Sequence, residues 1–523
     1  MVLCRSWSRV RLASEVITNR LQRNIVPLST AAAFVVFCVL YSFWLYRLPF
    51  GVGLWRTPGD FWATYLSSVA LVHGQFSQVY SQSTGLVTFP GISYLLTPAA
   101  LLTSALHLRL GQLANPYSQP TAWLIAGPFE MIISSLPIFA VDRCAERLSL
   151  SIPRRWALAF AQAAILVNVT VVWGHPEDAI SVGLVLYAAL AVQDGKYRRG
   201  AWLLGVAVAF QPLAFLAVPV LGARLSWRAA LRFLPVVIAP SLFVLAPLIV
   251  AEPASIWHAF VEQPNSPFLN HATPFTRFAP LLPDRIEVMA GPSRLLAVAV
   301  AAIVGVLICR RSEGIKPVLW TLALVFFIRL VFEATIADFY VWPVLAVVLL
   351  LSARRGLIPL ITMAVAAILL TWFQQIHWQG IWGWWVLTIG SLTVMLVLTR
   401  PRLVRLDVRL ASHHVKPWRW SVNQIWAFDL ILCALISGVD ALLGHRAILM
   451  GLLIAIPCCA LLTGRWSRTA MSGALAVALA VALGIPDGIW ATTTQLAYIG
   501  AIAAVALVCS FSAVSTERAI SRR

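Results

Sequence analysis

The stretch PLSTAAAFVVFCVLYSFWLY, residues 27–46, decides the class of this protein. It contains no charged side chain, and about twenty apolar residues are what a helix needs to cross a bilayer. The run is longer than the apolar core of a secretory signal and is followed by no small-residue cleavage site, so the sequence predicts an uncleaved signal-anchor. The preceding residues carry five arginines, Arg5, Arg9, Arg11, Arg20 and Arg23.

Composition extends this interpretation to the whole chain. Hydrophobic residues make up 60% of the sequence, charged residues only 11%, and the mean hydropathy is +0.84. These values predict an all-α, polytopic membrane protein. The net charge of +19 does not indicate nucleic-acid binding, because basic residues in such chains collect in cytoplasmic loops. The eight cysteines show neither a disulfide framework nor a metal-type spacing.

The basic clusters orient the predicted spans, since short cytoplasmic loops are rich in Lys and Arg. Ten spans then alternate correctly, near residues 28–48, 121–141, 156–173, 179–193, 230–251, 293–309, 317–332, 337–352, 358–373 and 381–399. Two further apolar stretches, 89–106 and 200–221, would invert the charge pattern if each crossed once. The second is interrupted by Gln211-Pro212, and both are expected to be re-entrant or to consist of short half-helices.

This topology places nine of the twenty acids on one face, although acids were not used to assign sides. The extracytoplasmic face receives Asp60, Glu177, Asp178, Glu252, Glu262, Asp284, Glu287, Glu333 and Asp338. The longest polar loop, 252–292, lies on the same face and adds Trp257, His258, His271 and Arg277. Two interpretations stay open: these residues form a catalytic site, or acids are merely tolerated outside the membrane.

Asp60, in PGDFW at residues 58–62, stands at the head of a second predicted helix. Apolar residues between Trp62 and Val79 recur at spacings of three and four, and Thr64, Ser67 and Ser68 fall on the opposite side. This pattern predicts an amphipathic helix lying along the outer membrane interface. Asp60 is then either its N-cap or a functional carboxylate held above the bilayer.

Two further stretches carry candidate site residues. VVWGHPEDAI, residues 171–180, reads as the start of a helix, with Pro176 at the first position followed by two acids, yet paired acids near hydrocarbon also suggest function. In RLVFEATIADFYVWP, residues 329–343, Arg329 and Glu333 are spaced to pair on one helix face, or Arg329 holds a phosphate. Glu130 sits inside an apolar span, where it is either functional or a satisfied structural residue.

The order of these segments resembles the GT-C superfamily of membrane glycosyltransferases. The resemblance is closest to family 87, the polyprenol-phosphate-mannose-dependent mannosyltransferases of actinobacteria, and covers roughly residues 25–400. It rests on the first span, the acid-bearing outer loop, the segment from WGHPEDAISVGLVLYAAL to AFQPLAFLAVPVL, and the ADFYVWPVL span. The resemblance implies an inverting transfer in which a first-loop carboxylate, here Asp60, is the general base. Gln211 stands where relatives often have a lysine.

The chemistry of such a transfer fits a chain without a nucleotide-binding loop. A lipid-phosphate sugar is already activated, so the enzyme needs a base for the acceptor hydroxyl and cationic groups for the departing phosphate. The sequence leaves open whether a divalent cation assists. The predicted partners are a polyprenyl-phosphate sugar donor, a glycolipid or polysaccharide acceptor and the lipid bilayer of a bacterial plasma membrane. Candidate substrate or phosphate contacts are His175, Glu177, Asp178, His258, His271, Arg277, Arg329, Glu333 and Asp338.

Four more apolar runs follow the basic linker 401–420 and predict a separate four-helix membrane module at 421–515. The other predicted parts are a cytoplasmic N-terminus, 1–25, a GT-C-like domain, 26–400, and a cytoplasmic tail, 516–523. The module resembles the small membrane modules that precede PP2C-type phosphatase domains in actinobacterial sensors. A lipid-linked substrate transporter or flippase, or a sensor or scaffold without catalysis, therefore stay as alternatives to the glycosyltransferase.

Overall fold

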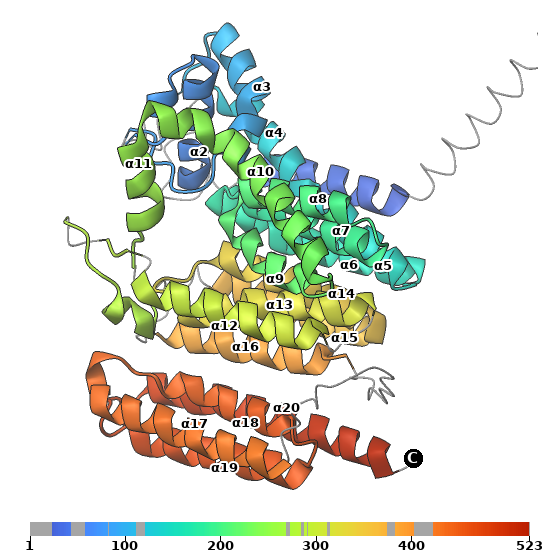
Figure 1. Ribbon diagram of the computed structural model, residues 1–523, viewed down its shortest axis with the longest axis vertical. Helices are drawn as coiled ribbons and strands as arrows, with labels where there is room; N and C mark the ends of the chain where they lie inside the picture. Colours follow the sequence, from blue (N-terminus) through green and yellow to red (C-terminus); the bar gives the residue numbers. More distant parts are fainter. Residues whose placement is uncertain are drawn as a thin grey trace, which may run out of the picture. The chain divides into compact units, whose positions relative to one another are not determined.

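The computed structural model describes residues 24–42, 58–81, 83–110, 121–267, 272–283, 287–289, 291–310, 314–373, 382–401 and 422–521. Every regular element in these ranges is a helix, and β-structure is limited to isolated bridges such as Asn265 with Val288. The all-α class is confirmed (Figure 1). The N-terminal arginines, the linker 402–420, Asp284, His271 and the side chain of Asp338 lie outside the described residues.

The chain forms two compact units, each described here by itself. The first comprises residues 1–218, 227–256 and 349–368, and the second residues 219–226, 257–348 and 369–523. This division does not test the domain boundaries predicted from the sequence, 26–400 and 421–515, which stay a prediction. The first unit contains the helix Asn24–Ser42, α2 (Gly59–Val72), η1 (Phe76–Gln78), α3 (Gly91–Ala105), α4 (Trp123–Ser135), α5 (Pro137–Arg147), α6 (Ile152–Val167), η2 (Asn168–Trp173), α7 (Pro176–Gln193), α8 (Tyr197–Phe210), η3 (Pro212–Leu216) and α10 (Trp227–Ala251).

The second unit holds the remaining complete helices. These are η4 (His258–Glu262), η5 (Pro274–Phe278), α12 (Gly291–Arg310), α13 (Ile315–Phe332), α16 (Gly383–Thr399), α17 (Val422–Leu443), η6 (Gly444–Arg446), η7 (Met450–Ile454), α18 (Ala455–Leu461), α19 (Trp466–Leu483) and α20 (Thr493–Ser521). Four helices cross a unit boundary: α9 (Ala217–Gly222), α11 (Pro253–Trp257), α14 (Asp338–Arg355) and α15 (Leu357–Phe373).

Nine helices among the described residues are long and apolar enough to cross a membrane, so the polytopic class is confirmed. They are Asn24–Ser42, Trp123–Arg147, Ile152–Trp173, Arg228–Ala251, Ser293–Arg310, Ile315–Phe332, Asn423–Arg446, Trp466–Leu483 and Thr493–Arg518. The predicted spans 179–193, 337–352, 358–373 and 381–399 also form helices, α7, α14, α15 and α16, of 17 or 18 residues.

The two stretches that did not fit as single crossings form short helices. Residues 89–106 contain the 15-residue α3. Residues 200–221 form two pieces, because α8 ends at Phe210 and η3 begins at Pro212. Gln211 between them has an extended backbone, as expected for a residue before proline.

The expectation that the helix after Asp60 turns a polar side to water is wrong, whereas its placement along the membrane interface stays a prediction. The helix α2 ends at Val72, and its polar side is as buried as its apolar side, with Thr64, Ser67 and Ser68 at most 2% exposed. These hydroxyls donate to backbone carbonyls within α2, and Ser67 also donates to Val79 O at 2.9 Å. The polar stripe predicted to face water is therefore satisfied by the backbone inside the unit. Periodicity cannot distinguish these two cases, since both place small hydroxyls on one face.

The helix α7 begins as its sequence predicts. Pro176 is its first residue, where the missing N–H costs nothing, and Glu177 and Asp178 occupy the first turn, where acids complement the helix dipole. At the other end of α7, Asp194 forms an ion pair with Arg147. Arg155, eight residues after Arg147, donates from Nε to Oδ1 of Asp142 at 2.7 Å. The acid-rich segment of the first unit therefore lies at the start of α7, and the basic segment lies at its end.

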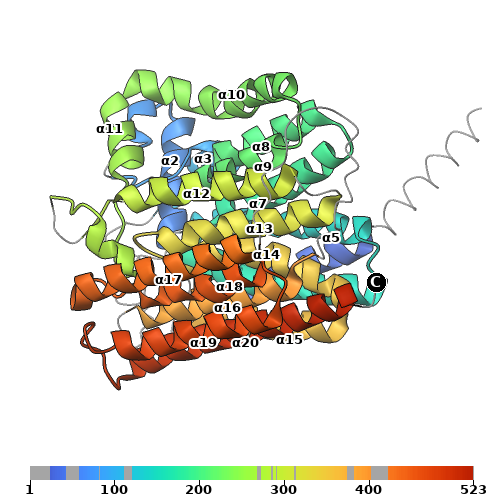
Figure 2. The ribbon, with the colours of Figure 1, turned by 60° about the horizontal axis from the view of Figure 1, so that its bottom comes forward.

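The C-terminal helices pack on one another within the second unit. In Figures 1 and 2, α17, α18, α19 and α20 lie side by side, and each is in contact with at least two of the others. Helix α20 also contacts α16, where a Cβ on Gly390 would lie 2.9 Å from that of Ala501. Small residues at such crossings let two helix backbones approach closely.

Candidate functional site

Asp60 is joined to a histidine 115 residues further along the chain. Its Oδ2 lies 2.8 Å from Nε2 of His175, which is the N-cap residue of α7. The Asp60 side chain is 52% exposed, whereas that of His175 is 13% exposed. The N-cap interpretation of Asp60 is wrong, because Pro58 is the N-cap residue of α2 and Asp60 lies inside the first turn. The carboxylate is therefore available for a contact other than its own helix.

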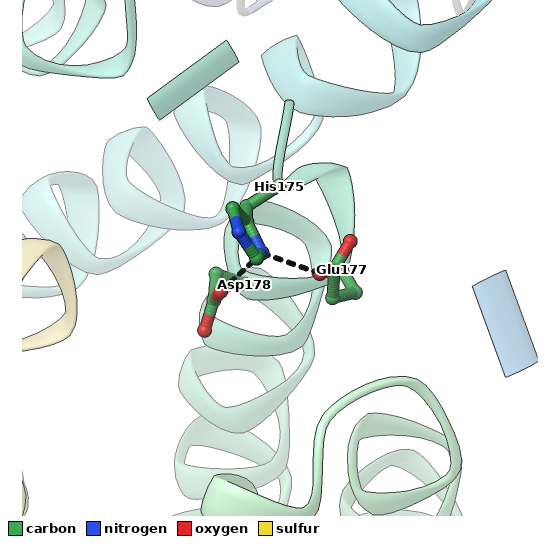
Figure 3. Close-up of side chains that lie close together, drawn as sticks. All are labelled: His175, Glu177 and Asp178. Carbon is green, nitrogen blue, oxygen red and sulfur yellow. Dashed lines mark hydrogen bonds and ion pairs between the residues drawn. The ribbon is translucent and has the colours of Figure 1, made fainter. Parts of the chain in front are cut away.

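The other ring nitrogen of His175 points at two buried carboxylates (Figure 3). Nδ1 of His175 lies 2.6 Å from Oε1 of Glu177 and 3.5 Å from Oδ2 of Asp178. Glu177 and Asp178 are 2% and 1% exposed. A row of hydrogen bonds thus leads from the half-exposed carboxylate of Asp60 through the nearly buried His175 to the buried carboxylate of Glu177. We call Asp60, His175, Glu177 and Asp178 the His175 cluster.

The charges around His175 determine its protonation. Burial alone lowers the pKa of His175, but the carboxylates of Glu177 and Asp60 outweigh this effect and hold the pKa well above its usual range. At neutral pH the ring is therefore an imidazolium, and both of its N–H groups donate to carboxylates. A histidine in this place binds the Asp60 carboxylate and fixes the direction of its side chain.

Two further residues surround the cluster. Gln211, in the break between α8 and η3, donates through Nε2 to Oδ1 of Asp178 at 2.9 Å. Glu130 on α4 is 1% exposed, its Oε1 has no hydrogen-bond partner, and it lies near enough to Glu177 and His175 to interact with their charges. The sequence indicated both positions, by the Gln-Pro break and by the lone acid in a span, but not that they meet at one place.

Gly174 allows the cluster to form. It has a φ of +75°, and a Cβ at this position would lie 2.5 Å from Cβ of Phe61 and 2.7 Å from Cβ of Pro58. Immediately before it, α6 widens into the π-helical turn η2, a distortion frequent at functional sites. The residue preceding His175 therefore packs directly against the start of α2, one residue from Asp60.

We expect Gly174→Ala to push His175 away from Asp60. The free energy of unfolding should fall by more than the roughly 1–2 kcal/mol of a left-handed backbone, because the added methyl group also overlaps α2. Any activity of the site should fall at least tenfold. Thermal unfolding in detergent and an activity assay measure the two effects.

The matched control is Gly195→Ala. Gly195 also has a φ of +75°, at the other end of α7, but a Cβ there meets nothing within 4 Å. It should show only the backbone cost and full activity. Equal effects of the two substitutions would contradict the proposed close contact.

The His175 cluster also has the donors of a divalent-metal site. One nitrogen of His175 and one oxygen each of Glu177 and Asp178 all lie within 4.8 Å of one another. If Nδ1 ligated an ion, the hydrogen bond from Nε2 to Asp60 would orient the ring, an arrangement common in metalloproteins. An imidazole with two carboxylates suits Mn²⁺ or Zn²⁺. Whether a divalent cation assists, which the sequence leaves open, therefore stays open.

A second cluster lies in the second unit and surrounds Glu333. Arg329 donates from Nε to Oε1 of Glu333 at 2.7 Å, so the predicted pairing is confirmed, although Glu333 is the C-cap residue that follows α13. Arg294 on α12, which the sequence did not single out, donates to both carboxylate oxygens, at 3.2 and 3.0 Å. Two guanidinium groups therefore share one fully buried carboxylate. Their attraction outweighs the effect of burial and lowers the pKa of Glu333.

The Glu333 cluster has one open donor. Nη1 of Arg329 is buried and has no hydrogen-bond partner, while the guanidinium lies 4.0 Å from the centre of the Tyr340 ring. Two arginines and one carboxylate leave a net positive charge, which favours an anion. Arg294 could have been suspected from sequence, because it is a cation at the start of a predicted span.

Threonine side chains of the loop before α12 bind the backbone of Glu333 and of the residue after it. Thr273 donates from Oγ1 to the carbonyl oxygen of Glu333 at 2.5 Å, and Thr276 donates to that of Ala334. The ring of Phe275 packs against that of Phe332 at 5.4 Å. These contacts order residues 273–276 beside Glu333.

His258 and Arg277 are part of neither cluster. His258 pairs with Glu262 at 2.6 Å, with both side chains 40% or more exposed. Arg277 is exposed in the last turn of η5. His271 and the side chain of Asp338 lie outside the described residues. Arg329 and Glu333 belong to the second unit and Asp60 to the first.

Comparison with known proteins adds no assignment to these two clusters. The chain matches no protein-family model and no curated protein.

Proposed function

We propose that this protein is an integral membrane glycosyltransferase. It transfers a sugar, mannose by its resemblance to family 87, from a polyprenyl-phosphate donor to a glycolipid or polysaccharide acceptor on the extracytoplasmic face. The observation that carries the proposal is the half-exposed Asp60 carboxylate, bound at 2.8 Å by a histidine that is itself held by buried Glu177. General bases are typically side chains oriented in this way by a second group.

The reaction needs one proton acceptor. The acceptor hydroxyl attacks the anomeric carbon of the donor, so that a new carbon–oxygen bond forms while the bond to the polyprenyl phosphate breaks. Oδ1 of Asp60 takes the hydroxyl proton, because Oδ2 is engaged by His175. The electron pair of the broken bond leaves on the phosphate, and attack from the opposite side inverts the anomeric configuration.

The Glu333 cluster carries an excess of positive charge of its own, which suits an anion such as a phosphate. Its two arginines exceed its single carboxylate by one charge, and Nη1 of Arg329 lacks a partner. A buried guanidinium binds a phosphate more strongly than an exposed one, since water competes less. We propose Arg329 as a phosphate contact within the second unit, with Arg294 holding Glu333 in place.

The direct test uses the purified full-length protein in nanodiscs. We expect it to transfer radiolabelled mannose from polyprenyl-phosphate mannose to an acceptor glycolipid, with release of polyprenyl phosphate and inversion. GDP-mannose should give no product, because no nucleotide-binding loop is present in the sequence. Absence of transfer from the lipid donor, under conditions where the protein is folded, would contradict the proposal.

One observation favours a transporter as the second candidate. Glu130, inside a span, lies close to Glu177 and His175, and lines of titratable groups in membrane helices are typical of proton relays. The same nanodisc preparation separates the two functions. A transporter would move the labelled donor between leaflets intact, whereas the transferase forms a new glycosidic bond.

A further inference from the structure

Two cysteine side chains from different C-terminal helices are in contact with each other. Sγ of Cys458 on α18 lies 3.8 Å from Sγ of Cys509 on α20, although the two residues are 51 positions apart in the chain. Cys509 is 0% exposed, whereas Cys458 is partly exposed. The spacing of the cysteines in the sequence did not indicate this pair, because the contact depends on how the helices pack.

A third helix holds the backbones on either side of the two thiols close together. A Cβ on Gly473 of α19 would lie 2.7 Å from Cβ of Ala506 and 3.9 Å from Cβ of Pro457. Pro457 directly precedes Cys458, and Ala506 stands three residues before Cys509, on the same face of α20. Helices α18, α19 and α20 therefore cross closely beside the two sulfurs, and a small residue at the crossing permits this approach.

A disulfide between these thiols requires only side-chain movement. Each sulfur has to move by about 1 Å to shorten the contact from 3.8 Å to the roughly 2.05 Å of a disulfide bond. A change of the staggered rotamer about the Cα–Cβ bond of a cysteine displaces its sulfur by more than this. The helices therefore need no rearrangement for the bond to form.

The two thiols belong to the end of the helices that the sequence predicts to be cytoplasmic. Arg465 follows Cys458 by seven residues, and Arg518 follows Cys509 by nine. Basic residues at the ends of membrane helices mark the cytoplasmic side. Cysteine pairs are normally kept reduced in that compartment, and those that do form disulfides there are usually transient and redox-sensing.

The apolar surroundings of the pair restrict which oxidant can reach it. Cys509 lies in the helix Thr493–Arg518, which is long and apolar enough to cross a membrane, and Cys458 lies in the shorter apolar segment Met450–Leu461. A charged oxidant such as glutathione disulfide would have to give up its hydration to enter such a place. A hydroperoxide carries no charge, so this is the class of oxidant that the site admits.

We propose that Cys458 and Cys509 form a redox modification site that a hydroperoxide converts to a disulfide. The partly exposed Cys458 reacts first. Its sulfur attacks one peroxide oxygen, the oxygen–oxygen bond breaks, and the thiol proton leaves with the other oxygen as an alcohol or water. Sγ of Cys509 then attacks the sulfenic acid, so that a sulfur–sulfur bond forms and the hydroxyl group leaves as water with the second thiol proton.

The two thiols together lose two electrons in this reaction, and one peroxide gains them. The disulfide links α18 to α20 across 51 residues. Such a link stabilises a protein mainly by restricting its unfolded chain, so we expect the midpoint of thermal unfolding to rise by about 5 °C on oxidation. This site is independent of the proposed glycosyl transfer.

The number of free thiols tests the proposal on the full-length protein in nanodiscs. Samples are treated with hydrogen peroxide or with cumene hydroperoxide, denatured, and labelled with a maleimide. We expect the label on six of the eight cysteines, and on all eight after reduction with dithiothreitol. Mass spectrometry should find the tryptic fragments 447–465 and 469–518 joined. Faster reaction with cumene hydroperoxide would identify lipid hydroperoxides as the source, and faster reaction with hydrogen peroxide a water-soluble peroxide.

Cys459→Ser is the matched control, since Cys459 is the next residue of the same helix and is also partly exposed. This variant should still form the disulfide and show the same rise in unfolding temperature. Cys458→Ser, Cys509→Ser and Cys509→Ala should instead be labelled at all seven remaining cysteines after peroxide treatment, with no rise. Full labelling of the peroxide-treated wild type, or a joined pair of fragments that persists in Cys458→Ser, would overturn the proposal.

Discussion

Asp60→Asn is expected to lower sugar transfer by about 10²–10⁴-fold, the usual contribution of a general base. An amide in place of the carboxylate cannot take the proton of the acceptor hydroxyl. The fold should be unaffected, because the side chain is half-exposed and does not cap α2. Initial rates with polyprenyl-phosphate mannose, together with thermal unfolding of the same preparation, measure both expectations.

Asp194→Asn is the control for this substitution. Asp194 lies at the opposite end of α7, where it forms an exposed ion pair with Arg147. Its loss should leave the rate within about twofold, as for exposed pairs in general. A further check is Asp60→Asn combined with His175→Gln, which should be no slower than Asp60→Asn alone because both residues act as one unit. Full activity of Asp60→Asn would exclude this residue as the base.

Glu333→Gln is expected to cause the largest loss of stability, about 3–5 kcal/mol. The neutral amide would leave the guanidinium groups of Arg294 and Arg329 without the carboxylate that both now bind. Glu333 is 0% exposed, so water cannot replace the lost contact. Denaturation in detergent, followed by tryptophan fluorescence, measures the difference.

Glu262→Gln is the matched control, since it removes a carboxylate of the same unit that pairs with His258 on the surface. Its cost should be about 0–1 kcal/mol. The pH dependence provides a second readout. The pKa of Glu333 is lowered in the folded state, so its stabilising effect is present above about pH 4.3 and is lost as the pH falls through the folded value. Glu333→Gln should lack this acid-dependent loss. Equal stability of Glu333→Gln and Glu262→Gln would contradict the proposed role of Glu333 in its cluster.

Local features of the fold could be predicted from the sequence because they depend on neighbours within one helical turn. Pro176 and the two acids after it start α7 as expected, and Arg329 pairs with Glu333 four residues later. The break at Gln211-Pro212 followed from the missing N–H of proline. The prediction for the pattern after Asp60 failed because it depended on contacts beyond one helical turn. It located a helix, but not which of its faces other helices would cover.

The apolar runs of this sequence by themselves determined an all-helical membrane protein, since only helices satisfy their own backbone in lipid and burial of long apolar stretches requires no knowledge of partners. Only the tertiary structure decided which polar groups meet. Asp60 and His175 are 115 residues apart, and Arg294 lies 39 residues from Glu333. Asp440 meets Asp487 across two helices. Such contacts depend on how helices pack, and helical periodicity carries no information about the identity of the neighbouring helix.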